Sequence, residues 1–511
     1  MGEQKSAEAI VSAFAKAVAD KSAVARAMVE KGRTLRHKVL TGEFAVAVEQ
    51  KTRRTPKGYP AFDYGEAGEA CPGRGEGHQA TTALCGAGTL AQGLMEAVVE
   101  PRNMRQARKR VSANQGSAGV DGMTVDELPA YLQQHWPAIR AQLLEGSYTP
   151  QPIKRVEIPK PDGGMRQLGV PAVVDRLIQQ ALLQVLEPLY DPSFSPSSYG
   201  FRPGRSAHQA LKAAREHVAS GKGWVVDLDL EKFFDRVNHD VLMNRLARRI
   251  GDKRVLKLIR RYLQAGVMLN GVVVERFEGT PQGGPLSPLL ANILLDEFDW
   301  ELQRRGHAFC RYADDCNVYV RSRRAGERVM ASLTRFLEAK LKLRVNREKS
   351  AVARPRERKF LGMRVVGVEK ARICLAPQSL LRLKATIRRI TKRNRGVSLS
   401  QLIRELNQST MGWVNYFALA EVKSACRELD RWIRRRLRCF VWKQWKTRQA
   451  RLGHLRQAGV GPWLAWGMVS GKHGCWKASG SPALTRAIPN QYLAQQGYQS
   501  LHERYLALTS A

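Results

Sequence analysis

The sequence has few acidic residues for its length. Its 511 residues include 46 Asp and Glu against 84 Lys and Arg, which gives a formal net charge of +38. An excess of positive charge on this scale repels itself unless a polyanion is the usual partner. Nucleic acid is the leading candidate for that partner, and an anionic membrane is the competitor.

Long apolar runs are also absent. No stretch approaches the roughly 18 to 20 uninterrupted apolar residues of a membrane-spanning helix, and the N-terminus lacks the layout of a secretory signal. These absences argue against the membrane and predict a soluble, intracellular protein.

Paired cysteines are missing as well. The eight cysteines include no Cys-x-x-Cys pair, so neither a zinc ribbon nor a redox dithiol is indicated. Cys71, His78 and Cys85 lie close together in the sequence, but this spacing is interpreted as incidental rather than as a metal site.

The pattern along the chain divides it into segments. Residues 1–92 begin with an Ala-rich helical stretch near Ser6 to Lys31 and continue into a Gly-rich stretch, Tyr64 to Gly93, that is typical of linker or disorder. From about Glu96 to Val366, β-rich runs alternate with amphipathic helices, an α/β pattern. Its clearest expected strands are "IKRVEIPK", "WVVDLDL", "HAFCRYADDCNVYV" and "KFLGMRVVGV".

After about Ala371 the strands are expected to stop, and the chain becomes helical and basic. Arg431 to Arg456 carries ten Lys or Arg and no acid. Ile433, Leu437 and Val441 fall at helical spacing and define one apolar face. A solvated basic face is the ordinary interpretation of such a helix. The nearby tryptophans favour a nucleic-acid surface with stacking platforms instead; they are Trp432, Trp442 and Trp445.

Acidic residues gather at two expected strand ends. In "WVVDLDLEKFFD" the apolar residues alternate with Asp227 and Asp229, so both acids should share one face, with Asp229 at the end of the strand. In "RYADDCNVYV", Asp314 and Asp315 lie between two strand-like runs, where a structural turn is the bland alternative. If the strands are neighbours in a sheet, Asp229, Asp314 and Asp315 form a carboxylate cluster able to hold two Mg²⁺ ions for nucleotidyl transfer.

These residues resemble a known family, the reverse transcriptases, and within them the maturases encoded by bacterial group II introns. "YADD" is similar to the family's catalytic hairpin, and "DLEKFFD" to the motif with the first metal-binding aspartate. The resemblance implies an α+β right-hand polymerase with fingers, palm and thumb, in which Asp229, Asp314 and Asp315 are catalytic and hold two Mg²⁺ ions. Adjacent acids point to opposite sides of a strand, so whether Asp315 ligates metal directly stays open.

Further motifs extend the resemblance over roughly residues 94–450. "IPKPDGGMRQLGVP" resembles the fingers hairpin, which implies that Lys160 and Arg166 contact the triphosphate. "GTPQGGPLSPLLANILL" implies that Gln282 lies beside the incoming nucleotide. Phe234 falls where the family places an aromatic gate against the sugar 2′-hydroxyl. Lys349 is a weaker candidate for a proton donor or phosphate contact, with a solvated lysine as the alternative.

The segment Leu402 to Lys446 resembles the maturase (X) domain, which also serves as the thumb and grips intron RNA. The expected RNA-binding residues on it are Arg434, Arg435, Arg438, Lys443 and Lys446. The expected organisation is an N-terminal extension (1–92), fingers and palm (93–368), thumb and maturase domain (369–450) and a basic tail (451–511). The tail has no His and Cys at the spacing of metal ligands, so no endonuclease is predicted in it. DNA binding is the role considered for this segment.

The predicted function is that of an RNA-directed DNA polymerase that copies intron RNA and assists the splicing of its own group II intron. A non-mobile reverse transcriptase, or an RNA-binding maturase that acts only in splicing, are the alternatives. The expected partners are group II intron RNA, a DNA target or primer and dNTPs, with no membrane. The expected location is the bacterial cytoplasm, in association with the nucleoid.

Overall fold

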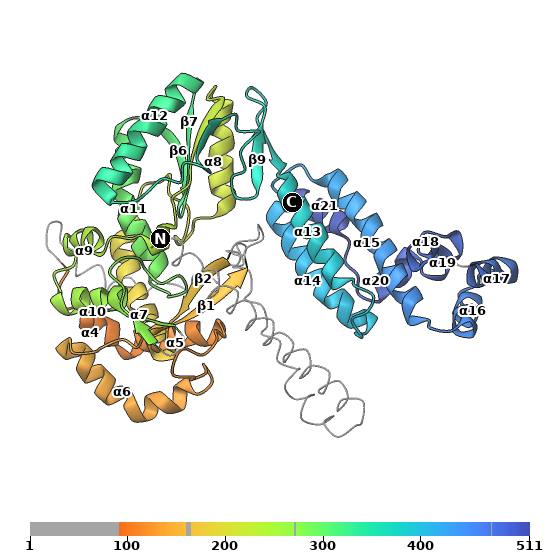
Figure 1. Cartoon of the computed structure of the whole chain (residues 1–511), viewed down its shortest axis with the longest axis horizontal. Coiled ribbons are helices and arrows are strands. Elements are labelled where there is room, and N and C mark those ends of the chain that lie inside the picture. The colour runs from red at the N-terminus through yellow and green to blue at the C-terminus, as the bar shows by residue number, and fades with distance from the viewer. Residues whose placement is uncertain (1–90, 160–164, 270–271, 472, 511) are drawn as a thin grey trace, which may run out of the picture. The chain divides into compact units, whose positions relative to one another are not determined.

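A computed structural model describes residues 91–159, 165–269, 272–471 and 473–510 of the chain (Figure 1). The expected N-terminal helix, the Gly-rich stretch up to residue 90 and the Cys71, His78 and Cys85 group lie outside the described residues.

The first described region combines helices with a mixed sheet. Its sheet has the order β2-β1-β4-β5, in which β1 pairs antiparallel with β2 and parallel with β4. The strands are β1 (Ile153–Pro159), β2 (Met165–Val170), β4 (Val267–Leu269) and β5 (Val272–Val274). The helices are α4 (Leu94–Val99), α5 (Pro101–Ala113), α6 (Leu128–Glu145) and α7 (Val173–Tyr190).

A second sheet carries the acidic motifs. It has the order β6-β7-β3-β8, and its neighbours are all antiparallel. The strands are β3 (Trp224–Leu228), β6 (Ala308–Tyr312), β7 (Asp315–Val320) and β8 (Ala351–Ala353). The helices of this part are α8 (Ala207–Ala219), α9 (His239–Ala247), α10 (Lys253–Gln264), α11 (Ser287–Arg304) and α12 (Arg323–Phe336), which runs into a π-helical turn at Leu337–Leu341.

The period-2 alternation of these strands determines which helices cover each face of the sheet. Val226 and Phe309 belong to the core that includes α11 and α12. Val225, Cys310 and Tyr319 belong instead to a second core that includes α8. The sheet is therefore covered by helices on both faces, as expected for successive residues that point to opposite sides.

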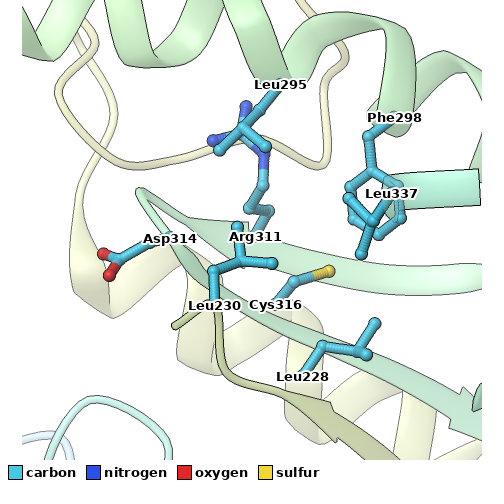
Figure 2. A pocket seen from close by; sticks show the side chains of 8 residues that line it. All are labelled: Leu228, Leu230, Leu295, Phe298, Arg311, Asp314, Cys316 and Leu337. Atoms are coloured by element: carbon cyan, nitrogen blue, oxygen red, sulfur yellow. The ribbon is translucent and has the colours of Figure 1, made fainter. Parts of the chain in front are cut away.

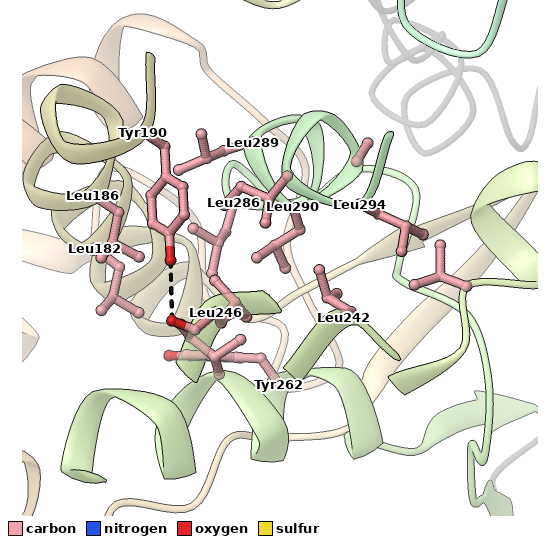
Figure 3. Packing of buried hydrophobic residues seen from close by; sticks show 14 of the residues in the cluster. Leu182, Leu186, Tyr190, Leu242, Leu246, Tyr262, Leu286, Leu289, Leu290 and Leu294 are labelled. Atoms are coloured by element: carbon pink, nitrogen blue, oxygen red, sulfur yellow. Dashed lines mark hydrogen bonds between the residues drawn. The ribbon is translucent and has the colours of Figure 1, made fainter. Parts of the chain in front are cut away.

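The first core also joins α7, α9, α10 and α11, as Figure 3 shows. Tyr190 ends α7 inside this core, and its hydroxyl donates a 3.1 Å hydrogen bond to the Leu246 carbonyl oxygen at the end of α9. A buried tyrosine needs such a partner for its polar end. The labelled leucines around it are Leu182, Leu186, Leu242, Leu286, Leu289, Leu290 and Leu294.

The remaining chain is mostly helical. A two-stranded ribbon, β9 (Met363–Val366) and β10 (Arg372–Leu375), precedes α13 (Pro377–Ile390), α14 (Leu399–Phe417) and α15 (Lys423–Gln444). The tail helices are α16 (Arg448–Gln457), α17 (Pro462–Ser470), α18 (Cys475–Ala478), α19 (Pro482–Ala487), α20 (Asn490–Gln495) and α21 (Leu501–Thr509). The expectation that strands stop after Ala371 is wrong for β10, because this short strand is set by its pairing with β9 rather than by its own pattern.

The second core continues through this helical part. Ile433, Leu437 and Val441 are buried in it, which confirms the apolar face expected on α15. The same core includes residues of α8 and of the tail, among them Leu501 in α21. Together with the sheets described above, this arrangement confirms the expected α+β fold class. The exact domain boundaries stay a prediction.

Candidate active site

The YADD motif forms a tight hairpin between β6 and β7. Tyr312 and Asp315 are the last paired residues, so Ala313 and Asp314 make a two-residue turn. Ala313 has φ +57°, a left-handed conformation that is uncommon for a residue with a side chain. Strained backbone of this kind is often found at functional sites. Here the strained residue comes directly before Asp314 and Asp315.

Asp229 follows the end of β3, next to this hairpin. β3 pairs with β7 so that Leu228 lies opposite Cys316, and continuing this register by one residue brings Asp229 opposite Asp315. The backbone of Asp229 is held by hydrogen bonds from Asn346 N to its carbonyl oxygen (2.8 Å) and from its own N–H to Ser350 Oγ (3.0 Å). The expectation that the two acidic strand ends are neighbours is therefore confirmed.

The electrostatics of the acids reflects their proximity. Burial raises the pKa of the Asp314 carboxyl above its usual range, and the Asp229 carboxylate raises it further, whereas Arg166 lowers it. Burial also raises the pKa of Asp315 well above its usual range, and the charges of Asp227, Asp314 and Asp229 add to that effect. Each acid thus destabilises the ionised form of the next, which a nearby cation would relieve.

An apolar floor beneath the hairpin explains part of the burial. Figure 2 shows the Asp314 carboxylate directed away from a small cavity behind the turn. The other residues that line this cavity are Leu228, Leu230, Leu295, Phe298, Arg311, Cys316 and Leu337. Water is therefore scarce on one side of the carboxyl group, which raises the cost of its charge.

The acids fit a divalent cation by their chemistry. Mg²⁺ prefers carboxylate oxygens together with waters and substrate phosphates, and Asp229, Asp314 and Asp315 present such oxygens at adjoining strand ends. No group of three or more His, Cys, Asp or Glu side chains in the described part of the chain is already arranged around one point as a metal site. The candidate site is therefore a set of donors that repel one another rather than a preformed cage.

Asp227 has a structural partner that the sequence did not reveal. Its carboxylate, buried inside β3, forms an ion pair with Arg358 at 2.6 Å, and Arg358 also donates to the Lys349 carbonyl oxygen. Burial raises the pKa of Asp227, and Arg358 opposes that rise. Asp227 therefore ties β3 to the segment after β8. Sequence alternation placed it beside Asp229, but no pattern linked it to an arginine 131 residues away.

Lys349 itself is exposed, and its side chain has no described contact with the acids. Lys359 is the lysine whose charge lowers the pKa of both Asp227 and Asp315. The role expected for Lys349 stays a prediction.

Lys160 and Arg166 are the two basic residues expected to bind the triphosphate. Lys160 lies outside the described residues. Arg166 is exposed on β2, opposite Ile158 of β1, and its charge reaches Asp314. Arg166 thus favours the ionised form of Asp314, and its contact with the triphosphate stays a prediction.

The loops that carry Phe234 and Gln282 meet at the same region. Thr280 N donates to the Phe234 carbonyl oxygen (2.7 Å), and Gly169 N donates to the Gln282 carbonyl oxygen (2.8 Å). Phe233 is buried in the core, whereas Phe234 is half-buried and packs edge-to-face on it with 5.1 Å between ring centroids. Phe233 therefore fills the packing role, and the ring of Phe234 remains partly accessible.

Comparison with known proteins identifies the chain. The family described as "Reverse transcriptase (RNA-dependent DNA polymerase)" matches residues 158–365, and "Group II intron, maturase-specific domain" matches residues 380–459. Protein YkfC of Escherichia coli (strain K12) is 33% identical over 354 residues, which are 61% of this chain and 91% of that protein. Group II intron-encoded protein LtrA of Lactococcus lactis subsp. cremoris is 39% identical over 194 residues, 38% of this chain and 32% of LtrA.

This chain belongs to the group II intron-encoded reverse transcriptases. It is an RNA-directed DNA polymerase with a maturase-specific domain, and reverse transcriptases generally use a divalent metal. The alignment spans about a third of LtrA, so activities of that whole protein are not carried over. A chain of the solved "Partial Cas6-RT-Cas1--Cas2 complex" is 28% identical and covers 48% of this chain and 43% of that chain, with a TM-score of 0.33.

Within the maturase domain of this reverse transcriptase, three of the expected RNA-binding arginines hold the C-terminal tail. Arg435 stacks on Trp476 at 4.2 Å and donates to the Trp476 carbonyl oxygen, and Arg438 donates to the Ile488 carbonyl oxygen. Arg434 lies over the Tyr498 ring at 5.8 Å. These guanidinium groups therefore have tail residues as partners, and their role in RNA binding stays a prediction.

For the other two expected RNA-binding residues, no such contact is seen with the described part of the chain. Lys443 and Lys446 are exposed near the end of α15.

The expected stacking platform at Trp442 is wrong, because that ring is 2% exposed and packs in the second core, edge-to-face with Trp445.

No helix in the described part of the chain is both long and apolar enough to cross a bilayer.

Proposed function

We propose that this protein copies intron RNA into DNA by two-metal nucleotidyl transfer and assists the splicing of the group II intron that encodes it. The observation that supports the polymerase mechanism is the strand register that brings Asp229 beside the Asp314 and Asp315 hairpin. The proposal rests on the matched maturase-specific domain for the splicing role.

The carboxylates would hold two Mg²⁺ ions, with Asp229 and Asp314 as principal ligands and Asp315 beside them. Bound in this way, the ions supply charge neutralisation for the attacking 3′-oxygen of the primer and for the leaving pyrophosphate. The apolar floor behind Asp314 keeps water from one side of the site, which strengthens electrostatic interactions there.

The neighbouring residues would select and orient the nucleotide. Lys160 and Arg166 neutralise the triphosphate, and the charge of Arg166 already acts on Asp314. Phe234 presents its ring edge to the 2′-position, so a ribose hydroxyl clashes and a deoxyribose does not. Gln282, on the loop hydrogen-bonded to β2, lies beside the incoming nucleotide.

RNA binding would use the basic surface of the maturase domain and the tail. No acid occurs between Asp430 and Glu503, so phosphate approaches this part of the chain without local repulsion. Lys443 and Lys446 are the exposed contacts, and Trp463, which is 90% exposed on α17, offers a stacking surface for the DNA or RNA that the tail binds.

Primer extension on an RNA template tests the polymerase mechanism. The wild-type protein with Mg²⁺ and dNTPs should extend a DNA primer, and Asp314→Asn should abolish extension because it removes a charged ligand. Asp240→Asn is the matched control, since Asp240 forms a surface ion pair with Arg260 and its side chain is 81% exposed. Robust synthesis by Asp314→Asn would show that the metal ligand is misassigned. Accelerated splicing without any synthesis by the wild type would favour the splicing-only maturase.

A further inference from the structure

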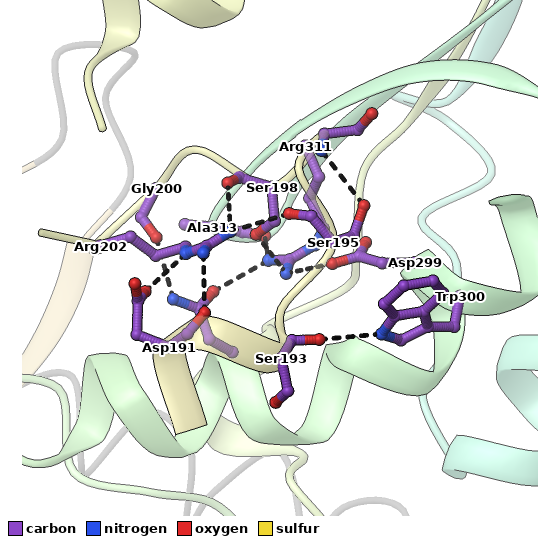
Figure 4. Close-up of polar contacts among 12 residues, drawn as sticks. Asp191, Ser193, Ser195, Ser198, Gly200, Arg202, Asp299, Trp300, Arg311 and Ala313 are labelled. Atoms are coloured by element: carbon purple, nitrogen blue, oxygen red, sulfur yellow. Dashed lines mark hydrogen bonds and ion pairs between the residues drawn. The ribbon is translucent and has the colours of Figure 1, made fainter. Parts of the chain in front are cut away.

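A buried arginine lies directly behind the YADD turn. Arg311 is 1% exposed, and a buried charge is costly unless it is paired and fully hydrogen-bonded. Its Nε and Nη2 donate to the two carboxylate oxygens of Asp299, which is itself fully buried, at 2.7 and 2.5 Å. This bidentate pair fixes the plane of the guanidinium (Figure 4).

The remaining donors of Arg311 connect three segments. Nη1 donates to Asn292 Oδ1 (3.0 Å) and to the Ala313 carbonyl oxygen (2.8 Å), and Nη2 also donates to Ser198 Oγ (2.7 Å). All five N–H groups of the guanidinium therefore have partners. One of those partners is the backbone of the turn itself.

The turn is also braced from the side of Gly200. A Cβ at Gly200 would lie 2.3 Å from Ala313 N and 3.0 Å from the Tyr312 carbonyl carbon, so only glycine permits this approach. Asn292 Nδ2 donates to the Gly200 carbonyl oxygen (2.9 Å), and the same Asn292 accepts from Arg311. The left-handed residue Ala313 is thus held on both sides.

We propose that Arg311, oriented by Asp299 and Asn292, is a positioning residue that sets the conformation of the YADD turn and thereby the placement of Asp314 and Asp315 for metal binding. This inference rests on the proposed role of the two acids. Arg311 does not touch substrate, so its contribution is to the geometry of the site rather than to the chemical step.

A neighbouring arginine distinguishes positioning from mere stabilisation. Arg202 has a side chain that is 5% exposed and forms an ion pair with Asp191 at 2.6 Å. It also donates to the carbonyl oxygens of Ser195 and Ser198 but makes no described contact with the turn. Loss of the Arg202 guanidinium should lower the folding stability, as loss of the Arg311 guanidinium does. It should leave Asp314 and Asp315 in place.

The test compares full-length Arg311→Lys and Arg202→Lys with the wild type. Primer extension gives kcat and the half-saturating Mg²⁺ concentration, anisotropy gives the Kd for primer–template, and thermal melting reports folding. Lysine keeps a charge opposite Asp299 but cannot supply five donors. For Arg311→Lys we expect kcat to fall at least about tenfold, because small misplacements of reacting groups are costly. The half-saturating Mg²⁺ concentration of Arg311→Lys should rise at least about threefold, with the Kd for primer–template unchanged. Arg202→Lys should leave the half-saturating Mg²⁺ concentration unchanged.

Unchanged kcat and Mg²⁺ dependence in Arg311→Lys, or an equal shift in Arg202→Lys, would overturn the inference. If Arg311→Lys does not fold, Gly200→Ala decides, because its Cβ presses on the turn while the partners of Arg311 are retained; it should raise the Mg²⁺ requirement, and an unchanged requirement overturns the inference. Absence of primer extension by the wild type would instead remove the proposed function, so the two failures are distinguishable.

Discussion

Removal of Asp299 should be among the most destabilising single changes in the protein. Asp299 is fully buried and Arg311 is 1% exposed, so Asp299→Ala leaves an unpaired guanidinium in the core. Breaking such a buried pair typically costs about 3 to 5 kcal/mol. The exposed pair between Arg323 and Glu327 is the matched control, with side chains 68% and 55% exposed. Glu327→Ala should cost about 0.3 to 0.5 kcal/mol, the range for surface helix pairs.

Urea unfolding followed by circular dichroism measures both losses. The double variant Asp299→Leu with Arg311→Met separates the unpaired charge from lost packing, because replacing a buried pair by apolar residues is often neutral. It should recover part of the stability that Asp299→Ala loses, because Asn292 Oδ1, Ser198 Oγ and the Ala313 carbonyl oxygen then lose their Arg311 donors. A loss below about 1 kcal/mol for Asp299→Ala would refute the reasoning, since it would mean that the guanidinium reaches water or another partner once its carboxylate is gone.

Three further predictions concern the reaction and RNA binding. Phe234→Ala should permit ribonucleotide incorporation, measured by primer extension with rNTPs, and unchanged sugar discrimination would remove Phe234 from the gate. Burial raises the pKa of Asp314 and Asp315, and Mg²⁺ binds only the deprotonated acids. The half-saturating Mg²⁺ concentration should therefore fall as the pH rises through those pKa values. A half-saturating concentration that does not change with pH would contradict this. Replacing Lys443 and Lys446 by Gln should weaken intron RNA binding. It should also reduce the slope of log affinity against log salt concentration by the amount expected for about two phosphate contacts, whereas an unchanged slope would place the RNA elsewhere.

Part of the site could be predicted from the sequence because local patterns encode it. Alternation in "WVVDLDL" places Asp227 and Asp229 on one face, and the strand-like runs on both sides of Asp314 and Asp315 predict that these acids lie at a turn. The pairing of β3 with β7 then brings Asp229 to Asp315. The alternation and the turn depend on patterns that a single sequence displays, whereas the pairing of the two strands is a contact that the structure supplies.

The rest depends on contacts between distant segments. Arg311 reads as a strand residue, and only the tertiary structure shows that it meets Asp299 on α11 and Ser198 on a preceding loop. Similarly, the sequence does not show that Trp442 is buried in the second core, with the Arg451 guanidinium over its ring at 4.6 Å. The partners of Arg435 could not be predicted either, because a basic helix looks the same whether its arginines meet RNA or a tryptophan of the same chain.

The proposed function gives one chain two activities, the copying of its intron RNA and help in splicing it. In vitro splicing, at low Mg²⁺, of RNA transcribed from the DNA that flanks the reading frame tests both activities when wild-type protein and Asp314→Asn are compared in parallel. We expect both proteins to accelerate excision, while only the wild type extends a primer on the same RNA. No acceleration by either protein, together with primer extension by the wild type, would contradict the splicing role and leave a reverse transcriptase that acts without its intron.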